Sequence, residues 1–316
     1  MTLPGADLSG LQPKLLESGA GGLAWWKLSR GGEIADPRFG VLHDAFRYQI
    51  ARLRMAEKDL TGATRLLEPH GVRPILGKGW AAAGAYAVPA LRPTGDIDLY
   101  VRPDDFECAR DALRPSGAPI DLHRGCPEIE DSFASVADRA VTRRCGDATV
   151  LCFEPSDHLR LVIRHFFRHG AWRPLWLCDI AALLEFETLD WNRILGGSRA
   201  SVSWIVAATK LARDLLGARL PESAPLETLS GPAPPWLVTA VLAVWGRAFV
   251  PHGRRVPMAA RLARPGDFVK GLRERWPNAI EAAIELGLPA DAPPSLPLKV
   301  GASLRRTSRF LQASSN

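Results

Sequence analysis

The sequence predicts an α+β fold in which a small mixed β-sheet is followed by a helical domain. Three observations lead to this prediction. Short apolar stretches bounded by glycine and proline recur between residues 73 and 153, and such stretches are typical of β-strands. Segments with apolar residues at helical spacing precede these stretches and separate them. After Pro155 only helical patterns follow, so we place a domain boundary near residue 154.

The chain begins with a segment that has no clear period, followed by one long helix. Residues 1–34 are rich in Gly and Leu and lack a sustained pattern, so we expect an N-terminal tail. Residues 44–67 carry apolar side chains near helical spacing, and the glycine within 69–72 is a common helix end. With this leading helix, residues 35–154 are predicted to form the α/β core.

Strands and short helices alternate through the rest of the core. The strands are expected at residues 73–77, 96–101, 119–124, 140–145 and 148–153. The helix predicted at 80–87 is rich in alanine, a strong helix former. The helix predicted at 102–117 begins with Pro and acids, which suit the positive N-terminal end of a helix. Gly146-Asp147 predicts a turn between the last two strands.

The second half of the chain, residues 155–290, is predicted to be helical throughout. Its first helix begins with a Ser/Asp capping signal. The helices are expected at 156–169, 174–186, 199–217 and 235–248. Residues 291–316 contain Pro, Ser and Arg, and we expect them to form a loose C-terminal tail.

Cysteine usage and hydropathy predict a cytoplasmic protein. The five cysteines are odd in number and form no CxxC pair, which argues against a disulfide framework or a zinc ribbon. The N-terminus lacks the features of a signal peptide. Apolar stretches such as residues 236–245 are too short to cross a bilayer, so we expect no membrane partner.

The net charge of +6 suits anionic partners without requiring one. The segment 247–275 is rich in Arg and Lys, and a basic run of this kind can follow an RNA backbone. Such runs are more often solvated surfaces. Nucleic acid is therefore an alternative partner that the sequence does not favour.

Two acids stand one residue apart in an apolar strand. In a strand, Asp96 and Asp98 would point to the same face. Like charges at such close range would push one acid to hold a proton unless a cation joined them. Asp121 lies on the next predicted strand and can converge on the same edge. Three carboxylates suit Mg²⁺, with Mn²⁺ as a second candidate, and a two-metal site can stabilise phosphoryl transfer.

The motifs ILGKGWAAAGAY, LRPTGDIDLYV and PIDLH together resemble the nucleotidyltransferase superfamily, which has the DNA polymerase beta-like fold. They are most similar to a branch of bacterial nucleotidyltransferase-like proteins that also share a segment like PSDHLRLVIRHFFRHGAWRPLWLCDIAALL. The resemblance covers residues 40–190. It implies transfer of a nucleoside monophosphate from ATP or another NTP to an unidentified hydroxyl-bearing acceptor, with release of pyrophosphate.

The resemblance also implies roles for particular residues. Asp96 and Asp98 match the metal-binding pair, and Asp121 matches the third acid, which helps to deprotonate the acceptor hydroxyl. The residues that would contact the triphosphate are Gly77, Lys78, Gly79 and Arg92.

Two departures from the family pattern keep other functions open. Trp80 stands where the superfamily usually has a small polar residue, and the spacing between Asp98 and Asp121 is short. Both favour a degenerate protein that binds a nucleotide or a partner without catalysis. A further alternative is a toxin-like or tailoring enzyme that acts on tRNA, a peptide or a glycan.

Several histidines and one buried acid complete the set of candidates. His123 is interpreted as a base or as a structural hydrogen-bonding group. His165 and His169 share one helix face and are predicted to form a polar patch on the acceptor side. Asp179 interrupts an apolar helix and needs a cation, for which Arg164 or Arg168 is the expected source.

Overall fold

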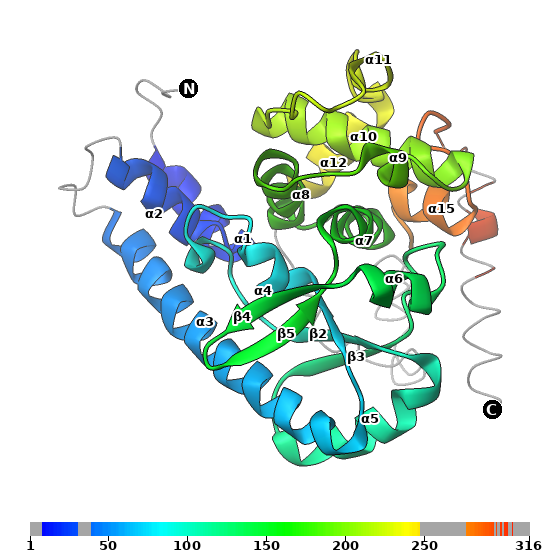
Figure 1. The fold of residues 1–316 in the computed structure, drawn as a ribbon. Coiled ribbons are helices and arrows are strands. Elements are labelled where there is room, and N and C mark those ends of the chain that lie inside the picture. Colours follow the sequence, from blue (N-terminus) through cyan, green and yellow to red (C-terminus); the bar gives the residue numbers. More distant parts are fainter. Residues whose placement is uncertain are drawn as a thin grey trace, which may run out of the picture.

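The computed structural model of the chain describes residues 8–30, 39–246 and 276–293, together with 295, 298, 300–302 and 305. Within these residues a five-stranded mixed sheet is followed by a group of helices, as predicted (Figure 1). The strands are β1 (Ile75–Gly77), β2 (Ile97–Val101), β3 (Ile120–Arg124), β4 (Val141–Cys145) and β5 (Ala148–Cys152). The basic run at 247–275 lies outside the described residues.

The helices of the first half are α1 (Gln12–Ser18), α2 (Gly21–Arg30), α3 (Gly40–Leu67), α4 (Lys78–Ala83), α5 (Phe106–Leu113) and α6 (Phe133–Arg139). Those of the second half are α7 (Pro155–Arg168), α8 (Pro174–Phe186), α9 (Trp191–Ile194), α10 (Arg199–Leu216), α11 (Leu226–Leu229), α12 (Pro235–Trp245) and α15 (Ala279–Glu285). Among the described residues, no helix is long and apolar enough to span a membrane.

The strand order in the sheet is β3-β2-β1-β5-β4. Strand β1 lies at the centre, antiparallel to β2 and parallel to β5. The predicted hairpin of β4 and β5 is confirmed, with Cys145 opposite Ala148 across the turn. Strands β2 and β3 are parallel and are joined by a crossover through α5.

Each face of the sheet is covered by a different set of helices (Figure 1). On one face, Leu99 and its alternating neighbours pack against α3 and α5 through residues such as Leu60 and Leu113. On the other face, Tyr100 and Phe153 pack against Leu161 of α7. Because side chains alternate along a strand, β2 contributes Leu99 to one core and Tyr100 to the other.

The segment expected to be a tail at residues 1–34 contains two helices. Helix α1 ends at Gly19, which has φ +83°, and α2 then packs along α3. The Gly-rich sequence hides this pairing because Gly21 and Gly22 serve as close-contact positions rather than as linkers. A Cβ on Gly21 would lie 3.0 Å from the Cβ of Ala45 in α3, so glycine at this position lets the two helices approach closely. Helix α3 also begins earlier than expected, at Gly40.

The helices after residue 154 share a core of their own. Phe166 and Phe167 of α7, Trp204 of α10 and Ile280 of α15 lie in one buried apolar cluster. Polar side chains link this region to the sheet region. Asp157 of α7 is fully buried, and its Oδ2 accepts a hydrogen bond from Arg139 Nε of α6 at 2.9 Å.

Candidate functional site

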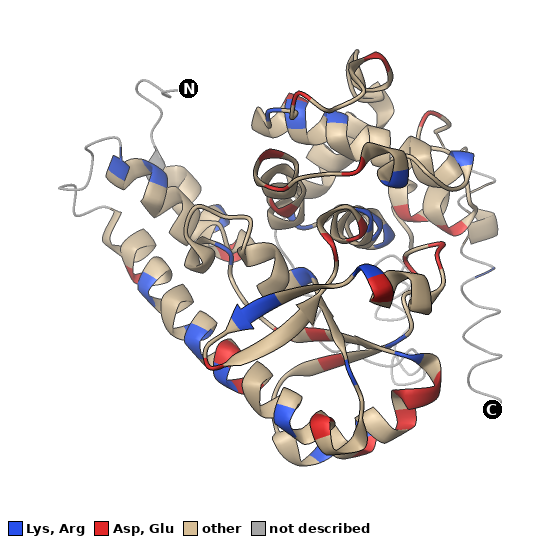
Figure 2. Ribbon diagram, in the orientation of Figure 1, with Lys and Arg blue, Asp and Glu red and all other residues tan. Residues whose placement is uncertain are grey.

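Two of the predicted acids lie side by side because of the register between β2 and β3. Asp98 is paired with Asp121, and Tyr100 is paired with His123. Side chains that are in register on parallel strands share a face. The short spacing between Asp98 and Asp121 is therefore the length of one crossover through α5. Figure 2 shows acidic residues on these two adjacent strands.

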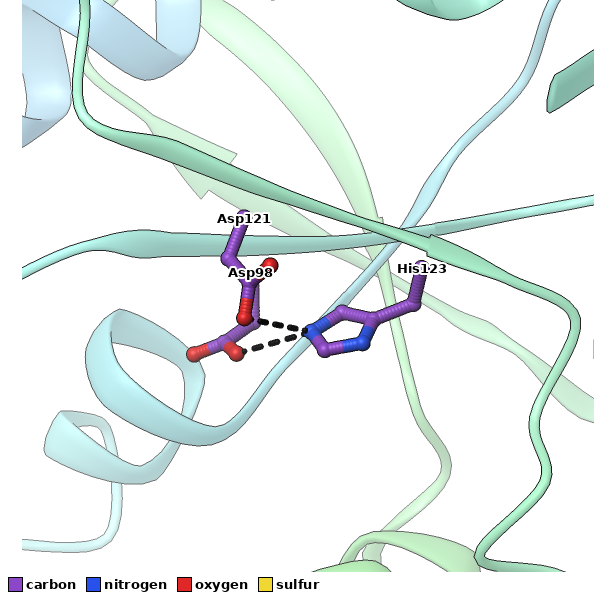
Figure 3. Close-up of side chains that lie close together, drawn as sticks. All are labelled: Asp98, Asp121 and His123. Atoms are coloured by element: carbon purple, nitrogen blue, oxygen red, sulfur yellow. Dashed lines mark hydrogen bonds and ion pairs between the residues drawn. The ribbon is translucent and has the colours of Figure 1, made fainter. Parts of the chain in front are cut away.

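His123 joins the two carboxylates (Figure 3). Its Nε2 lies 3.0 Å from Asp98 Oδ1 and 3.2 Å from Asp121 Oδ2. Lys78, the first residue of α4, donates a hydrogen bond from Nζ to Asp98 Oδ1 at 2.7 Å. Lys78 Nζ is also 3.3 Å from His123 Nε2. Residues from β2, β3 and α4 thus form one compact cluster of two acids and two bases.

The carboxylates shift the ionisation of His123. Burial opposes its charged form, but the hydrogen bonds to Asp121 and Asp98 outweigh this effect and raise the pKa of His123 to about 9. The same hydrogen bond from His123 lowers the pKa of Asp121. The imidazole therefore carries a proton at neutral pH and neutralises part of the acidic charge.

The position of Lys78 is fixed by an uncommon backbone conformation. Lys78 has φ +48°, a backbone conformation that residues other than glycine rarely adopt. Its salt bridge to Asp98 is buried, and Nζ lies 5.5 Å from the ring centroid of Tyr100. The Tyr100 ring in turn stacks on His123, with centroids 4.3 Å apart. Strained residues of this kind are held by their surroundings and are frequent at functional sites.

The donor atoms of Asp98, Asp121 and His123 fit a divalent cation. One ligand atom from each lies within 4.8 Å of the other two. Asp98 Oδ1 is occupied by Lys78 and His123, whereas Oδ2 accepts no hydrogen bond from the part of the chain that is described. Carboxylate oxygens suit hard cations such as Mg²⁺ and Mn²⁺. His123 would have to lose its proton before it could coordinate a metal.

Asp96 does not belong to this group of donor atoms. Strand β2 begins at Ile97, so Asp96 lies in the bend that precedes it and is exposed. The rule that residues i and i+2 share a face applies within a strand, and Asp96 is outside it. Its part in the site remains a prediction.

The residues of the glycine turn have different surroundings. Gly77 is buried, and a Cβ there would lie 2.8 Å from Leu161 and 2.9 Å from Tyr100, so its close packing requires glycine. A Cβ on Gly79 would lie 3.4 Å from the backbone oxygen of Asp96. Trp80 is partly buried and packs against the core that lies between the sheet and α3.

Arg92 is buried and engaged with Asp179 of α8. Its Nη2 lies 2.9 Å from Asp179 Oδ2, Nε lies 3.2 Å from Oδ1, and Nη1 donates to the backbone oxygen of Pro93 at 2.7 Å. Tyr86 also donates a hydrogen bond to Asp179 Oδ1 at 2.7 Å. The expectation that Arg164 or Arg168 would pair with Asp179 is wrong, because the partners come from the loop before β2 and from the end of the α4 segment.

His165 and His169 lie on the helical side of the site. Their ring centroids are 4.5 Å apart, and the ring of Trp176 lies 4.4 Å from that of His165. Burial and the nearby charge of Lys78 lower the pKa of His165 well below its ordinary value. The charges of His169, Arg92 and His123 act in the same direction.

The sequence indicated most of these residues but not the contacts among them. The contact of Lys78 with Asp98 and His123 joins segments 20 and 45 residues apart. Tyr86 was not singled out, although its hydroxyl is part of the Asp179 pair. Its place in a tyrosine-poor, alanine-rich segment was the available signal, since the chain has three tyrosines in all.

The chain was compared with protein families, curated proteins and solved structures. A family model described as "Uncharacterised nucleotidyltransferase" matches residues 39–125 and 118–216. These residues include all five strands, the acidic cluster and helices α7 to α10. The comparisons with curated proteins and with solved structures gave no match.

Proposed function

The chain belongs to this nucleotidyltransferase family, and on that basis we propose that it moves a nucleoside monophosphate from an NTP to a hydroxyl-bearing acceptor. The acceptor oxygen would attack the α-phosphorus, the bond between the α- and β-phosphates would break, and pyrophosphate would leave. The observation that carries this proposal is the in-register pair of Asp98 and Asp121, in which Asp98 Oδ2 accepts no hydrogen bond from the described residues.

The two acids take different parts because their exposure differs. The Asp98 side chain is 7% exposed and that of Asp121 is 54% exposed. Both would hold a divalent cation, Mg²⁺ or Mn²⁺, which when bound would neutralise charge on the phosphates. Asp121 faces solvent and is a carboxylate at neutral pH, and the hydrogen bond from His123 lowers its pKa further. It is therefore placed to accept the proton of the acceptor hydroxyl, with His123 orienting it.

The remaining predicted residues would bind and orient the substrates. We propose that Lys78 donates to the triphosphate, and that Gly79 leaves room for it beside Asp96. Asp96 would be the further acid of the metal site. Gly77 and Arg92 would act by shaping the turn and the loop around the nucleotide, because both are buried. His165 and His169 would face the acceptor.

Nucleotide binding by calorimetry tests the proposal. We would titrate ATP, GTP, CTP and UTP with and without Mg²⁺ into the wild type, Asp98→Asn and Asp121→Asn. We expect one NTP to bind only with Mg²⁺, and the Asp98→Asn change to weaken it at least about 10-fold, which corresponds to 1.4 kcal/mol. Asp111→Asn is the matched control, since Asp111 is an exposed acid on α5, paired with Arg114.

Two further outcomes would decide between the proposal and its alternative. Release of pyrophosphate from the bound NTP, lost in both site variants and kept in Asp111→Asn, would support transfer. Absence of binding to any NTP at millimolar concentration would overturn it and would favour a protein that binds a partner without catalysis.

A further inference from the structure

Arg173 is a second arginine near Arg92, and its guanidinium has no partner among the described residues. It is the residue that precedes α8, and its Nε is fully buried without a hydrogen bond to any described group. In the described part of the chain its side chain forms no ion pair within 4.0 Å. Arg92, by contrast, donates to both oxygens of Asp179 and to a backbone oxygen.

The guanidinium of Arg173 lies where the N-terminal helices, the loop before β2 and the helical region meet. A Cβ built on Gly19 would be 3.3 Å from Arg173 Nη2 and 3.1 Å from Cγ of Pro93. Burial, followed by the positive charge of Arg92, lowers the pKa of Arg173, while the charges of Asp179 and Asp96 oppose this effect. Arg173 therefore faces the loop that leads from Arg92 to Asp96.

This place adjoins the acidic cluster. Asp96 comes two residues before Asp98, and a Cβ on Gly79 would lie 3.4 Å from the backbone oxygen of Asp96 and 3.5 Å from Arg92 Nη1. Gly79 follows Lys78, which binds Asp98. Arg173, Arg92 and Lys78 thus carry positive charge around the loop that leads to Asp96 and the acidic cluster.

A half-buried cation without a partner is unfavourable, because burial removes hydration that no protein group replaces. Neither neighbouring acid compensates for this lost hydration. Asp179 is already bonded to Arg92 and Tyr86, and Asp96 is exposed. An anion with several oxygens would satisfy the free donors, and the planar guanidinium matches phosphate oxygens in a two-bond arrangement.

We infer that Arg173 binds the β- and γ-phosphates of the donor NTP, which leave as pyrophosphate. This inference rests on the proposed function and assigns to Arg173 the phosphate contact that the sequence assigned to Arg92. Arg92 then acts indirectly, since it ties the loop at Pro93 to Asp179 and so fixes the loop opposite Arg173.

The connection that carries Arg173 is held in place from two sides. Gly170 has φ +68° and Ala171 has φ +56°. Asn278 Nδ2 donates to the backbone oxygen of Gly170 at 2.8 Å, and Trp245 Nε1 donates to that of Ala171 at 2.8 Å. This support fixes the backbone at the start of α8, so less backbone entropy is lost when Arg173 binds an anion.

The experiment measures the affinity of Arg173→Gln, Arg173→Lys and wild type for three probes: the preferred NTP with Mg²⁺, inorganic tripolyphosphate, and the matching NMP. We expect Arg173→Gln to weaken NTP and tripolyphosphate at least 10-fold, the equivalent of about 1.4 kcal/mol. NMP affinity should not change, and Arg173→Lys should recover part of the loss. Arg199→Gln, an exposed arginine at the start of α10, is the control.

The outcomes separate this inference from the proposed function. If Arg173→Gln folds with the wild-type unfolding midpoint and binds NTP as tightly as wild type, the inference is wrong while transfer can still stand. If the wild type binds tripolyphosphate through Arg173 but transfers no nucleotide, the anion site stands and the proposed function fails. If the wild type binds none of the probes, both are overturned.

Discussion

Two buried ion pairs lie near one another, and they differ in what surrounds them. Lys78–Asp98 has a separation of 2.7 Å, with side chains 10% and 7% exposed. Arg92–Asp179 has a separation of 2.9 Å, with side chains 6% and 2% exposed. Distance and burial do not distinguish the two pairs.

The neighbours of the two acids do distinguish them. Asp179 accepts hydrogen bonds on both oxygens, from Arg92 and Tyr86. Asp98 is bonded through Oδ1 alone within the described residues, and it adjoins the exposed Asp121. A pair whose acceptors are all used serves the fold, whereas a pair with an unused oxygen beside an exposed acid can take a ligand. This difference teaches that the acceptor atoms left without hydrogen bonds, rather than burial, distinguish the pair that we propose to be functional.

The largest expected effect comes from breaking each pair with the same change. Asp179→Asn leaves the buried Arg92 without a counter-ion, so we expect a loss of about 3–5 kcal/mol in the free energy of unfolding. Asp98→Asn should cost about 1 kcal/mol, because Lys78 and His123 can turn to Asp121 and to solvent. Urea unfolding of both variants at one pH measures the difference.

Equal losses in the two variants would break the comparison, because the Asp98 pair would then be as structural as the Asp179 pair. Asp98→Ala and Asp179→Ala provide a second matched set in case the asparagine amide finds a new partner. Circular dichroism of each variant at low urea would show whether it starts from the native fold.

An intermediate effect on the free energy of unfolding is expected at His158, whose pKa is affected by one residue of each pair. Burial, followed by the charges of Arg143 and Arg92, lowers the pKa of His158 to about 3, and the charge of Asp98 opposes this. Neutral His158 therefore stabilises the folded protein, because its pKa is near 6.5 in the unfolded chain and near 3 in the folded one. This contribution is fully present above pH 6.5 and is lost as the pH falls, by about 2 kcal/mol between pH 7 and pH 5.

Unfolding at pH 7 and pH 5 for wild type and His158→Phe would test this. The acid-dependent loss should be smaller in the variant by about the amount given for one histidine. The same slope in both proteins would show that His158 is not kept neutral between the two pairs. His158→Gln, which also lacks a titrating group, provides a check on the size of the replacement.

The smallest effect is expected at an exposed pair on α5. Arg110 and Asp111 lie 3.2 Å apart, with side chains 53% and 56% exposed. Solvent screens such pairs, so Arg110→Ala should change the free energy of unfolding by less than about 0.5 kcal/mol. A loss comparable to that of Asp179→Asn would mean that charge removal itself, rather than burial of the pair, sets the scale.

The strands and their order of appearance were predictable, because apolar alternation and turn residues are local signals. The pairing of Asp98 with Asp121 followed from two adjacent strands that each carry an acid. The alternation rule failed at Asp96, since sequence does not show that β2 begins one residue later. Helix α2 was missed because the glycines at its start serve close packing against α3.

The bonding within the site was beyond local reasoning. Arg92 pairs with Asp179, which is 87 residues away in the sequence. Its guanidinium is therefore engaged rather than free to bind phosphate, and this follows from how α8 packs against the loop before β2. Arg173 has no sequence signal other than its place before Pro174. The role that we infer for it rests on a buried Nε without a hydrogen bond among the described residues, which only the three-dimensional arrangement reveals.

The backbone conformation of Lys78, with φ +48°, has one further consequence. It keeps a resident ammonium group against Asp98, so the acids on β2 and β3 do not face each other bare when no metal or nucleotide is present. A structural zinc site loses its fold to a chelator because the metal itself supplies folding energy. Here Lys78 itself balances the charge of Asp98, so we expect the sheet to stay folded when divalent ions are removed.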